Sequence, residues 1–144
     1  MSFRQQLATQ LPYLRRYARA LTGSQTLGDA AVRETLEALL EAPEEWDEAA
    51  PVKTELFRTF HRIWRSDMIV PLQSRGRSGV IAEFPIKRRQ SLLLSTVEGF
   101  KAHEVAKILG ISESDVHSHV VAARSAIEDA LCARVLIIED ETII

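Results

Sequence analysis

The sequence predicts an all-α protein made of two small helical domains joined by a linker. Apolar residues recur at helical spacing through most of residues 1–69 and again through residues 85–132. Between them, residues 70–84 contain a proline, two glycines and two serines without a clear period, which is typical of a linker. Residues 133–144 differ, because a continuous apolar run there predicts a buried β-strand.

The first domain is predicted to contain three helices. Ser2 caps the first helix, in which Pro12 predicts either a kink or a separate short helix. Thr26 caps the second helix, which runs to about Glu41. A third helix starts near Pro51 and carries aromatic and aliphatic side chains on one side. Its other side is basic, with Arg58, His61, Arg62 and Arg65.

The second domain is predicted to end in a helix-turn-helix. A fourth helix begins at Pro85, and the motif itself occupies residues 98–131. Gly110 ends the first helix of the motif, because a residue without Cβ adopts the left-handed conformation freely. Ser112 caps the second helix, and Asp115 completes a capping box.

The charge of this motif does not suit a DNA reader. Residues 98–131 contain three basic and six acidic residues, a formal net charge of −3. Binding to phosphate requires the opposite sign. The motif therefore keeps the shape of a DNA-binding unit, but we do not expect it to read DNA in the usual way.

Composition indicates a soluble cytoplasmic protein that is not an enzyme. The chain has 144 residues and a net charge of −2, and Cys132 is its single cysteine, so no disulfide framework exists. It contains neither a long apolar run nor a signal peptide. No nucleophile–base pair or complete metal-ligand set appears. His117 and His119 are two residues apart, so they point in different directions on a helix, and we do not expect them to bind a metal together.

Two long stretches are similar to regions of extracytoplasmic-function sigma factors. Region 2 resembles LPYLRRYARALTGSQTLGDAAVRETLEALLEAP followed by ELFRTFHRIWRSDMI. Region 4 resembles RRQSLLLSTVEGFKAHEVAKILGISESDVHSHVVAARSAI. In region 4, the basic residues that such factors typically carry after the capping serine are reduced here to Arg124. In region 2, Arg65 is followed by Ser66 and Asp67 instead of the typical asparagine and further basic residues. The chain thus resembles a sigma factor that has lost its DNA contacts.

The final stretch ARVLIIEDETII resembles the first strand of a response-regulator receiver. Glu139 and Asp140 then correspond to an acidic pair that would hold Mg²⁺ only in an intact receiver, so no cofactor is expected in this chain. Because 144 residues leave no room for the rest of a receiver, we expect a truncated form of a longer protein. A sigma-like domain ahead of a receiver is similar to the PhyR type of anti-anti-sigma factor.

This resemblance implies a decoy that sequesters a small helical anti-sigma factor of the NepR type and so frees the genuine sigma factor. In the full-length family, phosphorylation of the receiver releases the sigma-like domain for binding. The alternative is a DNA-binding sigma factor that works with RNA polymerase. We expect an amphipathic partner helix to lie in a groove between the two helical halves.

Eight apolar residues are candidates for partner binding, although burial in the core is the competing interpretation for each of them. In the first half they are Val32, Leu36, Leu39 and Leu40, and in the second half Leu93, Val97, Val116 and Val120. The arginines of the third helix either face the acidic residues 29–48 internally or retain weak nucleic-acid affinity, and we favour the internal pairing.

Overall fold

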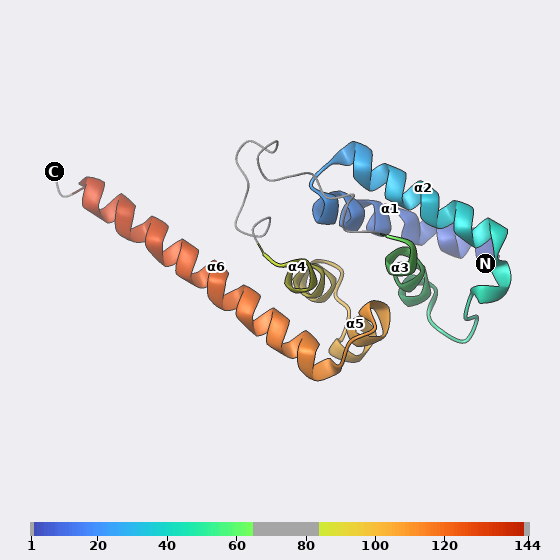
Figure 1. Ribbon diagram of the computed structural model, residues 1–144. Coiled ribbons are helices and arrows are strands. Elements are labelled where there is room, and N and C mark those ends of the chain that lie inside the picture. Colours follow the sequence, from blue (N-terminus) through green and yellow to red (C-terminus); the bar gives the residue numbers. More distant parts are fainter. Residues whose placement is uncertain (1, 65–83, 143–144) are drawn as a thin grey trace.

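The computed structural model describes residues 2–64 and 84–142, with side chains placed up to residue 137. Within these ranges every regular element is a helix, which confirms the all-α class (Figure 1). The elements are α1 (Phe3–Thr22), α2 (Gln25–Glu41), the 3-10 helix η1 (Pro43–Glu45), α3 (Val52–Ile63), α4 (Ile86–Leu92), the π-helical turn η5 (Leu93–Val97), α5 (Ala102–Leu109) and α6 (Glu113–Thr142). Arg65 and most of the predicted linker, residues 70–84, lie outside the described ranges.

Helix α1 is held by strong local signals at both ends. The Ser2 hydroxyl accepts a hydrogen bond from the Gln5 amide at 3.3 Å, and the Gln5 side chain accepts from the Ser2 amide at 2.9 Å. Gly23 closes the helix in the left-handed conformation, with φ of 74°. Pro12 lies inside the helix, so the separate short helix does not form. The predicted cap of α2 was wrong by two residues, since Ser24 rather than Thr26 accepts the first amide hydrogen bond.

The helix-turn-helix prediction is confirmed. Gly110 adopts φ of 67° between α5 and α6. The Ser112 hydroxyl then accepts from the Asp115 amide at 3.1 Å, which starts α6. These two residues fix the turn between the helices, as their types predict.

The two helical halves pack onto each other around one continuous core. Helix α3 contacts α5, and α1 contacts η5. Leu14, Tyr17 and Phe57 of the first half belong to the same buried cluster as Leu94 and Val105 of the second. The helices before and after the linker, which the sequence pattern assigns to two domains, therefore share an extended interface. We call this interface the seam.

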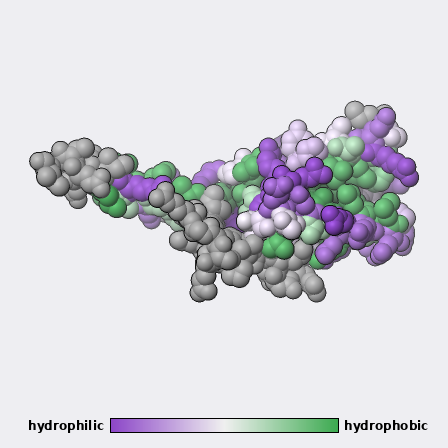
Figure 2. Space-filling view, turned by 90° about the horizontal axis from the view of Figure 1, so that it is seen from above, coloured by the Kyte–Doolittle hydropathy of each residue, from purple (hydrophilic) through white to green (hydrophobic). Residues whose placement is uncertain are grey.

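The strand predicted over residues 133–144 is wrong. Helix α6 continues through these positions to Thr142, and its end extends away from the body (Figure 1). A strand must pair its backbone groups with a neighbour, whereas a helix pairs them internally. The described residues offer no strand to pair with. The part of α6 before this end carries exposed apolar side chains (green in Figure 2), among them Leu131, Val135 and Leu136.

Candidate partner-binding site

A buried carboxylate joins the two halves at one side of the seam. Glu98 follows η5, and its side chain is inaccessible to solvent. Arg16 of α1 donates to it from Nε at 3.2 Å and from Nη2 at 3.0 Å. This hydrogen-bonded carboxylate raises the pKa of Arg16. Lys53 of α3 donates to the Glu98 backbone carbonyl at 2.9 Å, and its Nζ lies 3.6 Å from the carboxylate.

Aromatic rings surround the ammonium group of Lys53. Its Nζ lies 4.9 Å from the ring centroid of Tyr13 and 4.9 Å from that of Phe100. Phe57 and Phe100 in turn meet edge to face at 5.1 Å. A cation, a buried anion and three rings thus lock α1, α3 and the segment before α5 together.

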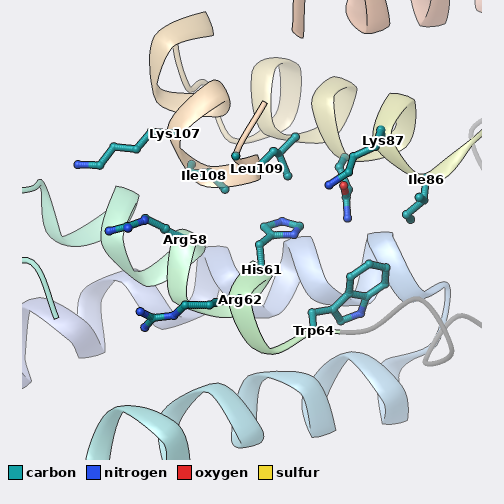
Figure 3. Close-up of a pocket in the computed structure, with 11 residues that line it drawn as sticks. Arg58, His61, Arg62, Trp64, Ile86, Lys87, Lys107, Ile108 and Leu109 are labelled. Carbon is teal, nitrogen blue, oxygen red and sulfur yellow. The ribbon is translucent and has the colours of Figure 1, made fainter. Parts of the chain in front are cut away.

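A pocket of about 540 Å³ opens elsewhere along the seam, between α3, α4 and α5 (Figure 3). We call it the seam pocket. No acidic residue is among the eleven that line it. Its lining residues are Arg58, His61, Arg62, Trp64, Ile86, Lys87, Gln90, Lys107, Ile108, Leu109 and Gly110. The seam pocket is therefore lined by basic and apolar side chains together.

His61 stands at the centre of the seam pocket and is held by Tyr17. The Tyr17 hydroxyl oxygen lies 2.7 Å from His61 Nε2. Burial and then the charge of Lys87 lower the pKa of His61 to about 3, so the imidazole is neutral at physiological pH. Burial raises the pKa of Tyr17 well above its usual value, so the phenol keeps its proton. Tyr17 can therefore donate to His61, which leaves the ring's own proton on Nδ1.

Two polar atoms in the seam pocket are buried without a hydrogen-bond partner. They are Nε1 of Trp64 and Oε1 of Gln90, and Gln90 as a whole is only 2% exposed. A buried polar group that makes no hydrogen bond is costly, so such atoms are uncommon in folded proteins. Both atoms belong to side chains that face a cavity able to hold a ligand.

The basic rim of the seam pocket is partly neutralised from within the chain. Arg62 of α3 lies 3.5 Å from Glu45, and Lys107 of α5 lies 3.6 Å from Asp47, so the acidic segment after α2 contacts one basic residue on each side of the pocket. Of the three arginines predicted to face residues 29–48, Arg62 pairs with that segment. Arg58 pairs instead with Glu55 of its own helix at 3.3 Å, and Arg65 lies outside the described residues. Lys87 has no acidic partner within residues 2–64 and 84–137.

The eight residues predicted to bind a partner are divided between core and surface. Six of them belong to the central core or pack against it: Val32, Leu36, Leu39, Leu93, Val116 and Val120. Leu40 is 80% exposed and Val97 is 47% exposed, which leaves these two available to a partner. The predicted Mg²⁺ pair, Glu139 and Asp140, lies on α6 beyond the last described side chain.

The sequence did not reveal the seam pocket as a site. The basic side of α3 gave a partial signal through His61 and its neighbouring arginines. Lys87 and Gln90, however, come from a helix on the far side of the linker, and no spacing rule brings them to α3. Within the described residues, no group of three or more potential metal ligands occurs, and none of the helices combines the length and the hydrophobicity that a membrane span requires.

Residues 7–61 match the family described as the Sigma2 domain of PhyR, and residues 83–130 match the sigma-like domain of response regulator PhyR. The PhyRSL–NepR complex of Sphingomonas sp. Fr1 contains a chain that is 38% identical, with a TM-score of 0.75. The match covers 90% of this chain and 88% of that one. The chain belongs to the PhyR family.

Two further relatives define the extent of this similarity. The phyllosphere-induced regulator PhyR of Methylorubrum extorquens is 43% identical over the whole of this chain, which spans only 56% of that protein's length. The sigma factor RpoE of Bartonella quintana, solved in complex with the anti-sigma factor NepR, is 21% identical with a TM-score of 0.75. It covers 90% of this chain and 96% of its own, and at this identity it shows a shared fold alone. The PhyR family thus keeps the architecture of a sigma factor.

Proposed function

We propose that this chain binds and sequesters a NepR-type anti-sigma factor and thereby releases the sigma factor that this partner inhibits. The observation that carries the proposal is the Sphingomonas complex, in which a PhyR chain covering nearly the same residues is bound to NepR. Because the two chains share 38% of their residues and one fold, we infer the same class of partner here.

The chemistry of the surface supports a protein partner over DNA. The exposed positions at the start of α6 include Glu113 and Asp115, which repel phosphate. Exposed Leu40 and Val97 suit an amphipathic helix instead. The seam between the halves offers a hollowed surface close to both units. A DNA-binding sigma factor remains the less favoured alternative.

The longer relatives suggest how binding is controlled. The Methylorubrum PhyR is nearly twice as long as this chain, and related structures are described as response regulators. We therefore infer that this chain is the sigma-like part of a regulator whose receiver controls access to the anti-sigma factor. It acts in the cytoplasm, where transcription takes place, and it acts by binding rather than by catalysis.

Titration calorimetry with a purified NepR-type anti-sigma factor tests the proposal. We expect tight one-to-one binding. A parallel arm titrates the chain with promoter DNA and core RNA polymerase, where we expect no association. Binding to polymerase and DNA without binding to the anti-sigma factor would replace the decoy with a working sigma factor.

A further inference from the structure

The seam pocket gathers hydrogen-bond donors and positive charge around a space without an acidic residue. The Trp64 indole presents an unpaired, buried N–H. The Lys87 ammonium points toward His61 across the pocket (Figure 3), and no acid neutralises it within the described side chains. Such a site favours a ligand that accepts hydrogen bonds and carries negative charge.

His61 and Gln90 add two more groups that can donate. With Tyr17 donating to Nε2 at 2.7 Å, the neutral imidazole carries its proton on Nδ1. The described residues supply no hydrogen-bond partner for that N–H. The Gln90 amide presents a buried, unpaired oxygen, and a half-turn of its last torsion replaces this acceptor with an NH₂ donor.

We propose that the seam pocket is a carboxylate-binding site that receives an acidic side chain of the anti-sigma partner. This inference rests on the proposed function and adds the chemical group by which the partner is anchored at the seam. Trp64 and Lys87 make the direct contacts from opposite sides of the seam. A carboxylate between them would tie α3 to α4, so the partner would be held only while the two halves are packed together.

The acidic segment that follows α2 supports the assignment of the seam pocket as a carboxylate-binding site. Glu45 and Asp47 of the same chain already reach Arg62 and Lys107 at one end of the pocket, at 3.5 and 3.6 Å. The end that contains Lys87 has no such acid among the described side chains. At one end of the pocket the basic side chains are therefore paired with acids of the same chain. At the other end, an acidic side chain of the partner would pair with Lys87.

Calorimetric titration of variants against the NepR-type anti-sigma factor tests the proposal. Lys87→Gln removes the charge of an exposed side chain, and Trp64→Phe removes the N–H together with one ring of the indole while keeping an aromatic ring beside Phe60. Lys101→Gln is the matched control, since it removes an exposed lysine of the same half outside the pocket. We expect Lys87→Gln to weaken binding about tenfold, Trp64→Phe several-fold, and the control by less than twofold.

A double-mutant cycle identifies the anchoring residue of the partner. Each Asp and Glu of the anti-sigma factor is replaced by its amide and titrated against wild type and Lys87→Gln. At one position the loss seen with wild type should disappear with Lys87→Gln. If Lys87→Gln and Trp64→Phe bind as tightly as Lys101→Gln, or if no position couples to Lys87, the proposal is overturned.

A partner-free arm separates this inference from the proposed function. If the wild-type chain does not bind the anti-sigma factor, the proposed function fails and the partner is excluded as the source of the carboxylate. Glutarate is then titrated into the Trp46→Phe variant, in which Trp64 is the single tryptophan and reports by fluorescence. A saturable change that Lys87→Gln lacks would support carboxylate recognition with a free ligand, and no change would overturn the site altogether.

Discussion

Arg16 and Glu98 are 82 residues apart in sequence, yet the Nη2 atom of Arg16 lies 3.0 Å from a carboxylate oxygen of Glu98. The pair connects α1 to the segment that precedes α5, on the two sides of the linker. Because the Glu98 side chain is fully buried, its charge depends on Arg16 and Lys53 for compensation. The relative position of the two halves is therefore coupled to one carboxylate.

Replacing that carboxylate should destabilise the protein. Glu98→Gln keeps the size of the side chain but removes the charge that Arg16 and Lys53 share, and we expect a loss of about 1–3 kcal/mol in the free energy of unfolding. Urea unfolding followed by circular dichroism measures it. Glu45→Gln breaks the more exposed pair with Arg62 and should change stability by less than about 0.5 kcal/mol. Equal effects of the two variants would contradict a special role for Glu98.

Stability should fall in mild acid because of His61. Its pKa is about 3 in the folded chain and near 6.5 when unfolded. Between these values the unfolded chain binds a proton at His61 that the folded chain does not. The contribution of His61 to the free energy of unfolding is therefore fully present above pH 6.5 and decreases as the pH falls. We expect a loss of about 2 kcal/mol between pH 7.5 and pH 5, at about 1.4 kcal/mol per pH unit below 6.5.

The His61→Gln variant is the control for this pH dependence. It removes the titrating ring, so its urea midpoint should change much less than that of wild type over the same range. Stopping at pH 5 keeps the measurement above the range in which Asp29 takes up a proton, because the hydrogen bond from Arg19 lowers the pKa of that carboxyl. A wild-type midpoint that is flat from pH 7.5 to pH 5 would exclude a neutral His61 in the folded protein.

Gly28 marks the closest approach of α1 and α2. A Cβ atom at this position would lie 2.7 Å from the backbone nitrogen and 2.8 Å from the Cα of Arg19. Backbone atoms cannot move aside as a flexible side chain can, so Gly28→Ala should destabilise by about 1–3 kcal/mol although alanine favours helices. Thermal unfolding compares it with Thr26→Ala, an exposed change on the same helix. A melting temperature at or above that of Thr26→Ala would disprove the close contact.

Local signals made most of the fold predictable. The capping residues Ser2 and Ser112 and the turn residue Gly110 act on their immediate neighbours, so their types are enough to place helix ends. The strand prediction failed for the opposite reason. An apolar run becomes a strand only beside other strands, and residues 133–142 have none within the described chain. The conformation of residues 133–142 therefore depends on their tertiary surroundings.

The candidate site was less predictable than the fold. Helical spacing identifies apolar residues but not whether they face the core or a partner, so Val32 and Val116 were proposed together with Leu40 and Val97. In the structure, Val32 and Val116 are buried, whereas Leu40 and Val97 are exposed. The seam pocket depends on contacts across the linker, and no single-sequence pattern specifies them.

Exposure also yields a test of the predicted partner-binding residues. Leu40→Ala and Val97→Ala remove exposed side chains, so each should weaken binding to the NepR-type anti-sigma factor about tenfold without changing the melting temperature. Leu131→Ala, on the extended part of α6, is the matched control and should bind like wild type. Val116→Ala should instead lower the melting temperature, because Val116 is 1% exposed in the core. If Leu40→Ala and Val97→Ala bind as tightly as Leu131→Ala, the partner contacts other residues.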